Sequence, residues 1–327
     1  MPLVPVTPSR SGVSSADLTA TIAVALEGDT QRLGYEKCLR AVSAPVDHSH
    51  PPPASGTRID SYIVQDRLGE GASCHVFRGW DQSRLETVAL KLINWANVHD
   101  TAAAIKQLRV EAAALARVNH PSVVRFLDFG LDVRWPYLVT EYVPGAPLGD
   151  VIRAGALPAP WALYLASQVA DALGAVWRAG LVHRDVKPDN ILIGVEGRAT
   201  LIDFGLAKSI HSRDAQSTPE LAGTAGYLAP EQARDASRVD HRADIYGLGV
   251  TLYEALTGRL PFEGRNRMQV IFQHLNTPPV PPVDRVPDLP ALASDLCLWM
   301  LAKNPADRPR DHEELRRAFD AVIGATS

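Results

Sequence analysis

The sequence predicts an α+β protein of two lobes, a small β-rich lobe followed by a larger, mainly α-helical lobe. Between residues 59 and 143, apolar and polar residues alternate and turn signals separate the runs, which is typical of an antiparallel sheet. After residue 144 the apolar residues recur at helical spacing instead. This change of pattern predicts a cleft between the lobes at the connection, residues 141–147.

The composition excludes several classes of protein. The chain has 327 residues, of which 46% are hydrophobic, so it can bury a substantial core. Its 33 Lys and Arg nearly balance its 37 Asp and Glu, which disfavours nucleic acid as the main partner. Three widely spaced cysteines indicate neither a disulfide framework nor a zinc site and are typical of a reducing compartment. No apolar run is long enough for a secretory signal or a membrane span, so we expect a soluble cytoplasmic protein.

The first part of the chain differs from the rest. Residues 1–58 are rich in Ser and Pro, and prolines 51–53 favour an extended linker. We expect an arm that is flexible or partly helical within residues 15–44, and a docking role for it stays open. The remaining divisions are expected to be the small lobe at 59–143, the large lobe at 144–323 and a tail at 324–327.

The elements can be placed in order along the chain. Five strands are expected at residues 62–68, 74–80, 87–93, 124–129 and 137–141. A helix is expected at 101–118, where Ile105, Leu108, Leu115 and Val118 share one face. Two longer helices are expected at 160–179 and 239–257, where Gly180 and Gly258 are suitable C-terminal caps.

A glycine-rich segment, LGEGASCHV at residues 68–76, lies between the first two expected strands. Gly69 and Gly71 carry no Cβ, so the backbone of a hairpin there could approach phosphate oxygens closely. Such a pair alone is equally typical of an ordinary hairpin. Lys91 lies on the third expected strand and Glu111 on the helix, and we expect Glu111 to point toward the sheet and pair with Lys91. Taken alone, each of these two residues would be more typical of a solvated surface charge.

Residues 183–205 carry the strings HRDVKPDN and DFG. They bring Asp185, Lys187, Asn190 and Asp203 into one short region. Carboxylate and amide oxygens are the ligands that hard cations such as Mg²⁺ prefer. Turn caps would explain the two aspartates, but not the lysine and asparagine beside them.

With these strings in this order, residues 62–320, roughly four fifths of the chain, resemble a Hanks-type (eukaryotic-type) serine/threonine protein kinase in the style of soluble bacterial members. The matching strings are GEGASCHV, VALK, RVEAA, NHPSVVR, TEYVPG, HRDVKPDN, DFG, GTAGYLAPEQ, DIYGLG and DRP. The resemblance implies a protein kinase fold that binds ATP between its lobes and transfers the γ-phosphate to Ser and Thr hydroxyls of protein substrates.

The resemblance also implies the nucleotide site. Thr140 would be the gatekeeper, and the backbone of Glu141 and Val143 would hold the adenine. The residues implied to bind ATP are Leu68, Gly69, Gly71, Val76, Ala89, Lys91, Thr140, Glu141, Val143 and Leu192. Core packing is the plainer interpretation of Val76, Ala89 and Leu192, and both can hold at once.

For catalysis, the resemblance implies that Asp185 accepts the proton of the substrate hydroxyl and that Lys187 neutralises the transferred group. Asn190 and Asp203 would hold Mg²⁺, with Mn²⁺ as the alternative. Lys91, held by Glu111, would contact the α- and β-phosphates. Thr224 would bond to the catalytic aspartate and lysine, which is the serine/threonine pattern of the family.

Other matches imply architecture. Glu231 and Arg308 match a buried ion pair that anchors the activation segment, and Asp244 matches the carboxylate that braces the catalytic loop. A spine of contacts across the lobes is implied for Leu115, Phe126, His183 and Phe204.

Regulation is implied by position. Arg184 belongs to the family's pocket for a phosphorylated activation segment, and Thr218 lies six residues before Thr224, a spacing seen at autophosphorylation sites of similar kinases. We expect Thr218 as the main site and Ser217 as the second. A partner phosphatase and a homodimer are further expectations.

The chain departs from the family pattern at two places. Cys74 replaces the third glycine of the loop, which makes a redox role an alternative to an inert thiol. The position of an acidic ribose contact holds Ala146 and then Pro147, and Asp150 is the nearby candidate to replace it.

Three other functions compete with an active protein kinase. One is a pseudokinase scaffold whose N-terminal arm binds a partner, but every lysine, base and metal position is present. The second is a kinase of small molecules, which the peptide-platform segment GTAGYLAPEQ disfavours. The third is a binding module in residues 1–58, with kinase activity secondary.

Overall fold

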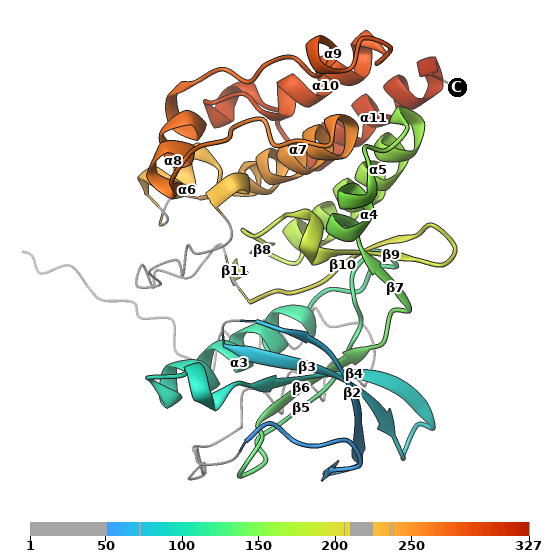
Figure 1. Cartoon of the computed structure of the whole chain (residues 1–327), viewed down its shortest axis with the longest axis vertical. Coiled ribbons are helices and arrows are strands. Elements are labelled where there is room, and N and C mark those ends of the chain that lie inside the picture. The colour runs from blue at the N-terminus through green and yellow to red at the C-terminus, as the bar shows by residue number, and fades with distance from the viewer. Residues whose placement is uncertain are drawn as a thin grey trace, which may run out of the picture.

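The structure is a computed structural model that describes residues 51–71, 73–205, 207–209, 225–235, 237 and 239–326. Figure 1 shows a small lobe built on a curled β-sheet and a larger lobe built of helices, joined on one side by the chain that runs from β6 to β7. The predicted protein kinase fold, with a β-rich lobe followed by a helical lobe, is confirmed.

The small lobe is a six-stranded antiparallel sheet with one long helix. The strands follow the order β1-β2-β3-β4-β6-β5, and helix α3 (Thr101–Leu115) packs against the sheet. The bounds are β1 Arg58–Ile59, β2 Tyr62–Glu70, β3 Cys74–Asp81, β4 Glu86–Ile93, β5 Phe126–Gly130 and β6 Tyr137–Glu141. Side chains along β3 and β4 alternate in burial, as the period of two predicts. One face therefore builds a core, and the other faces the large lobe.

The sheet curls until its two ends approach each other. The hydroxyl of Tyr62, on β2, donates to Asp128 on β5 at 3.0 Å, and the rings of Tyr62 and Tyr137 meet edge to face with centroids 5.5 Å apart. Tyr137 in turn donates to Asp60 at 2.6 Å. These contacts enclose a separate small core within the curl.

Residues 51–57, which we expected to belong to the arm, lie against this lobe. Pro53 is buried, and the indole Nε1 of Trp135 donates to the carbonyl of Pro51 at 3.2 Å. The N–H of Gly56 also donates to the carbonyl of Val64 at 2.8 Å. The ordered contacts of the small lobe therefore begin before β1.

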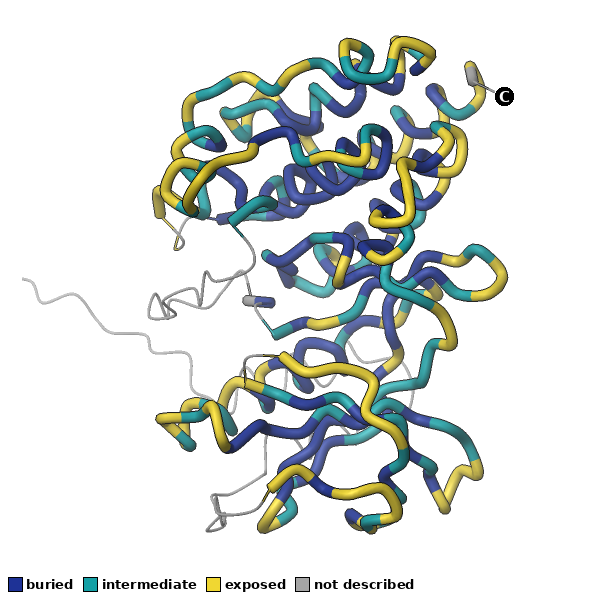
Figure 2. Tube along the Cα trace, viewed as in Figure 1, coloured by how far each residue is buried: buried dark blue, intermediate teal, exposed yellow. Residues whose placement is uncertain are grey.

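The large lobe consists of helices around α5 (Ala159–Arg178) and α7 (Arg242–Thr257), which pack on each other. Figure 2 shows this part of the lobe as largely buried. Its other helices are α4 Leu148–Ala154, α6 Pro230–Arg234, α8 Arg267–Asn276, α9 Pro282–Arg285, α10 Ala291–Met300 and α11 His312–Thr326. Its strands are β7 Gly145–Pro147, β8 Leu181–Val182, β9 Ile191–Gly194, β10 Ala199–Leu201 and β11 Lys208–Ser209. Short 3-10 turns lie at Trp95–Asn97, Pro188–Asn190, Ala225–Tyr227 and Pro305–Asp307.

Both predicted glycine caps are confirmed. Gly258 caps α7 with φ 71°, and its N–H donates to the carbonyl of Glu254 at 2.7 Å. Gly180 follows α5 with φ 72°. Such positive φ angles cost a glycine little, which explains why both helices end there.

Several boundaries differ from the prediction by one to three residues, among them the helix expected from residue 239, which begins at Arg242. The helix expected to reach residue 118 ends at Leu115, just ahead of a turn that leads to Pro121. The strand expected from residue 124 begins at Phe126, because the N–H of Val124 donates to the carbonyl of Leu201 in the large lobe at 3.0 Å. Among the described residues, no helix combines the length and the apolar surface that crossing a membrane requires.

Candidate active site

A cavity of about 400 Å³ lies between the lobes. This volume is within the range of small-molecule sites, roughly 300–1,000 Å³. All ten residues that the resemblance implied for nucleotide binding line it, together with Glu111, Asn190 and Asp203. The lining also includes residues that the sequence did not single out for binding, among them Tyr142, Gly145, Asp189 and Ile202.

The roof of the cavity is the turn between β2 and β3. The N–H of Gly71 donates to the carbonyl of Cys74 at 2.8 Å, which closes the turn. A Cβ added at Gly69 would meet no atom within 4 Å, so packing within the described residues does not itself require a glycine there. Burial raises the pKa of the Cys74 thiol, which disfavours the thiolate that a redox sensor needs.

Strand β4 places two side chains on the cavity side. Ala89 and Lys91 line the cavity, while Val88, Leu90 and Leu92 are buried in the core on the other face. Because side chains on a strand alternate between its faces, the string VALK is sufficient to produce this arrangement.

Lys91 lies between two carboxylates. Its Nζ is 2.6 Å from Oε1 and 2.8 Å from Oε2 of Glu111, and 2.9 Å from Oδ1 of Asp203. The expected ion pair with Glu111 is therefore present. Burial alone would lower the pKa of Lys91, but Asp203 and Glu111 outweigh it and raise the pKa. Burial raises the pKa of Glu111 to about 7.

Burial alone would raise the pKa of Asp203, but Lys91 and the N–H of Gly205 outweigh it and lower the pKa. The carboxylate at this position is therefore ionised near neutral pH, as a cation ligand must be.

Asp185 is held through one of its two carboxylate oxygens. Oδ2 of Asp185 accepts from Nζ of Lys187 at 2.7 Å and from Nδ2 of Asn190 at 2.9 Å. Asn190 also donates to the Asp185 carbonyl at 2.8 Å. Within the part of the chain that the structure describes, Oδ1 of Asp185 is buried without a hydrogen-bond partner. Asp185 therefore keeps one carboxylate oxygen in a fixed direction, with its hydrogen-bonding capacity unused by the described residues.

The backbone of this loop is strained and braced. Arg184 and Asp203 have φ angles of 70° and 61°, in the left-handed region that residues with a Cβ seldom adopt. The carboxylate of Asp244 accepts from the N–H of His183 at 2.8 Å and from that of Arg184 at 2.7 Å. The expected brace is present. The His183 and Phe204 rings also meet edge to face, with their centroids 4.8 Å apart.

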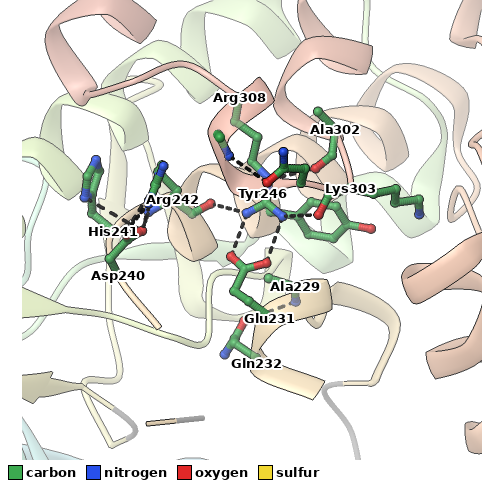
Figure 3. A network of polar contacts seen from close by, with 12 residues as sticks. Ala229, Glu231, Gln232, Asp240, His241, Arg242, Tyr246, Ala302, Lys303 and Arg308 are labelled. Atoms are coloured by element: carbon green, nitrogen blue, oxygen red, sulfur yellow. Dashed lines mark hydrogen bonds and ion pairs between the residues drawn. The ribbon is translucent and has the colours of Figure 1, made fainter. Parts of the chain in front are cut away.

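Figure 3 shows the second buried ion pair. Nη1 and Nη2 of Arg308 donate to the two oxygens of Glu231 at 2.7 and 2.8 Å. The same guanidinium lies over the Tyr246 ring, with its Cζ 4.8 Å from the centroid. It also donates to the backbone carbonyls of Arg242, Ala302 and Lys303. Helix α6 is thereby tied to α7 and to the loop after α10.

One residue of this region was missed by the sequence analysis. Gln232, on α6, donates from Nε2 to the carbonyl of Arg184 at 2.9 Å. A glutamine three positions after a helix cap suggests only a capping interaction. Its second partner becomes visible only when α6 is placed beside the catalytic loop.

Some residues that the sequence predicted for the site do not line the cavity or are not described by the structure. Asp150 is paired with Arg153 and does not line the cavity, whereas Asp189 does. Thr224, Thr218 and Ser217 lie outside the described residues.

The fit of a nucleotide and a metal can be judged from the groups present. Among the described residues, no three His, Cys, Asp or Glu side chains are grouped to hold a metal alone. Mg²⁺ in nucleotide sites typically takes one or two carboxylates and completes its shell with phosphates and water. Asp203 supplies a carboxylate, and Asn190, whose nitrogen bonds Asp185, keeps its oxygen for a cation. The residues therefore fit a metal bound together with phosphates.

The comparisons with known proteins agree with this geometry. Residues 62–319 match the model of the protein kinase domain. The serine/threonine-protein kinase PknL of Mycobacterium tuberculosis is 39% identical over 273 residues, covering 83% of this chain and 68% of that protein. PknB of Mycobacterium leprae is 37% identical over 263 residues, covering 79% of this chain and 42% of that protein. The solved kinase domain of Mycobacterium tuberculosis PknI superposes with a TM-score of 0.65 at 27% identity, covering 83% of this chain and 99% of that one.

Proposed function

We propose residue roles for this cleft from the premise that the chain belongs to the protein kinase family and is a Hanks-type bacterial serine/threonine protein kinase. As a member it uses ATP and a divalent metal and acts on protein substrates. The roles of its own residues, and the choice of Mg²⁺ over Mn²⁺, belong to the proposal. The single observation that carries them is Asp185, whose Oδ2 is held by Lys187 and Asn190 while its Oδ1 has no hydrogen-bond partner among the described residues.

The adenine is assigned to the cavity between Val76 and Ala89 above and Leu192 below. The N–H of Glu141 already donates to the carbonyl of Arg125 at 2.9 Å. We assign to the base the Glu141 carbonyl, which accepts from the Thr140 hydroxyl at 3.3 Å and has a second lone pair. Val143 is the second backbone contact, and Thr140 limits the depth of the pocket. Leu68, Gly69 and Gly71 cover the phosphates.

Phosphoryl transfer needs alignment and neutralised charge more than covalent chemistry. Lys91, fixed by Glu111, binds the α- and β-phosphates. Asp203 and Asn190 hold Mg²⁺, which offsets the charge of the phosphates. Oδ1 of Asp185 accepts the proton of the incoming Ser or Thr hydroxyl.

Lys187 lies 2.7 Å from the other oxygen of Asp185 and stabilises negative charge on the transferred group. Thr224 completes this contact set by the family pattern.

Several expectations rest on the sequence alone and remain proposals. They are autophosphorylation at Thr218 and then Ser217, a partner phosphatase, a homodimer, a cytoplasmic location, and the division into an arm at 1–58, of which residues 51–57 contact the small lobe, lobes at 59–143 and 144–323, and a tail at 324–327. Mass spectrometry of the active enzyme tests the first. Phosphate found only outside residues 206–222 would contradict it.

The residue roles are tested by Asp185→Asn. We expect phosphorylation of a generic protein substrate to fall by about 10³-fold, since removing a general base typically costs 10²–10⁴-fold. Nucleotide affinity should stay within a factor of about two, because Asp185 does not line the nucleotide cavity. The variant with activity within tenfold of wild type would contradict the assignment of the base.

A pseudokinase scaffold is the weaker candidate. It would lack at least one of the residues that grip ATP or the metal, and none of the positions Lys91, Glu111, Asp185, Asn190 and Asp203 is substituted.

A further inference from the structure

The side-chain amide of Gln232 joins two parts of the protein that lie far apart in the sequence. Its Oε1 accepts from the N–H of Ala229 at 3.1 Å, at the start of α6. Its Nε2 donates to the carbonyl of Arg184 at 2.9 Å, in the catalytic loop. The orientation of the amide is fixed by these partners, because turning it over would place a donor against a donor and an acceptor against an acceptor.

The peptide that Gln232 bonds leads directly into Asp185. Arg184 has φ 70°, and its N–H donates to Asp244 at 2.7 Å. Its carbonyl accepts from Gln232. Hydrogen bonds therefore hold both the N–H and the carbonyl of this strained residue. Strained backbone persists only where its surroundings over-determine it. A rotation of the Arg184–Asp185 peptide would turn the carboxylate of Asp185.

Gln232 is also adjacent to the anchor of the activation segment. The preceding residue, Glu231, forms the buried pair with Arg308. Helix α6 is therefore fixed on one side by that pair, and on the other it holds the catalytic loop through Gln232.

We propose that Gln232 is a positioning residue for phosphoryl transfer, which links the seating of α6 to the direction of the Asp185 carboxylate. This rests on the proposed function in one respect, the role of Asp185 as the base. Gln232 touches neither the nucleotide cavity nor the reacting groups, so it acts through the Arg184 carbonyl alone.

A plainer role for Gln232 is to cap α6. The two roles use different halves of the amide, since the oxygen serves the cap and the nitrogen serves the loop. Gln232→Glu separates them. The glutamate keeps an oxygen for Ala229 but places a second oxygen, with no proton at neutral pH, against the Arg184 carbonyl.

For Q232E we expect kcat to fall about tenfold, the effect of losing one hydrogen bond whose partner then stays unsatisfied. The KM for ATP should remain close to wild type and the thermal midpoint should fall by only a few degrees, because the cap and the nucleotide cavity are unchanged and one hydrogen bond is lost. As the pH falls toward 5, the kcat of Q232E relative to wild type should rise, because the protonated carboxyl can donate again. Q232M, which cannot titrate, should show a loss that does not depend on pH.

Gln269 supplies the matched control. Its Oε1 accepts from the N–H of Arg265 at 2.9 Å, in a comparable local contact on α8. Q269E should leave kcat within a factor of two of wild type.

The outcomes separate this proposal from the one on which it rests. Q232E with wild-type kcat, while Asp185→Asn is inactive, would overturn the positioning role and leave the base in place. Activity in Asp185→Asn would instead remove the base. A Q232E protein that loses its fold and its nucleotide binding would assign Gln232 to the cap of α6 and overturn the positioning role as well.

Discussion

The two guanidinium nitrogens Nη1 and Nη2 of Arg308 face the two carboxylate oxygens of Glu231 at 2.7 and 2.8 Å, and the Arg308 side chain is 0% exposed. Three backbone carbonyls satisfy the remaining donors of the arginine. Such a pair is costly to break, because either partner left alone is a charge largely removed from water, with Glu231 17% exposed.

We therefore expect Arg308→Ala and Glu231→Ala each to lower the free energy of unfolding by about 3–5 kcal/mol. The loss should be measured by urea unfolding. Arg316 and Asp320 form a control pair at 2.9 Å that is half exposed, and Arg316→Ala should cost less than about 1 kcal/mol. Equal costs at the two pairs would show that burial does not set the strength of the Glu231 contact.

A second prediction concerns Glu111, whose two oxygens lie 2.6 and 2.8 Å from Nζ of Lys91. Glu111→Gln keeps the shape but removes the charge that holds the ammonium. Hydrogen bonds to charged groups contribute about 1.5–3 kcal/mol, so kcat/KM should fall by roughly 10- to 150-fold.

Lys91→Met should abolish activity. The exposed pair of Arg259 and Glu263, at 2.9 Å, supplies the control, and Glu263→Gln should leave kcat/KM unchanged. A change below threefold in Glu111→Gln would mean that Lys91 is positioned by Asp203 alone.

A third prediction separates the metal from the nucleotide. A ligand at 100 times its Kd stabilises a folded protein by about 2.7 kcal/mol, so saturating ADP with Mg²⁺ should raise the midpoint of thermal unfolding by several degrees. EDTA should remove the part of this rise in the midpoint that depends on the metal. In Asp203→Asn, ADP should raise the midpoint only by the amount that does not depend on metal, and EDTA should not change it. A metal-dependent shift of wild-type size in this variant would place the metal on other residues.

Local patterns predicted much of this site. Alternation along β4 is enough to bring Ala89 and Lys91 to one face, and the glycines that end α5 and α7 act within a few residues of the chain. The strings around Asp185 and Asp203 identify the chemistry because the residue types themselves carry it. All of these signals depend on neighbours in sequence.

The features that were not predicted depend on contacts between distant segments. Val124 leaves its expected strand to bond Leu201 of the other lobe. The carbonyl of Pro51 is bonded by Trp135, 84 positions away, so a proline-rich stretch that suggests a free linker is packed on the lobe. The role of Gln232 likewise depends on where α6 meets the catalytic loop. Neither the hydrophobic periodicity nor the secondary-structure propensity of a segment predicts such contacts with distant segments.

The last prediction concerns pH and His312, at the start of α11. Its side chain is buried beside His241, with ring centroids 5.4 Å apart, and neither ring nitrogen has a hydrogen-bond partner among the described residues. Burial, with added repulsion from His241 and Arg178, lowers the pKa of His312 from 6.5 to about 3. Burial likewise lowers the pKa of His274 from 6.5 to about 4.

The direction of the effect follows from these values. The folded protein keeps both rings neutral, whereas the unfolded chain takes up a proton on each below about pH 6.5. The stability contributed by each neutral ring is complete above that pH. It declines by about 1.4 kcal/mol per pH unit as the pH falls toward the folded pKa. Acid should therefore destabilise the large lobe at a higher pH than that at which a carboxyl of ordinary pKa, about 4, takes up its proton.

His312→Leu should reduce this slope by about 1.4 kcal/mol per pH unit between pH 6 and 4, whatever its effect on stability at neutral pH. Urea unfolding at a series of pH values measures the slope directly. His99 is exposed, so His99→Leu serves as the control and should leave the slope unchanged. If His312→Leu and wild type lost stability in parallel, the ring would already be protonated in the folded protein, and a hidden acceptor would have to lie beside it.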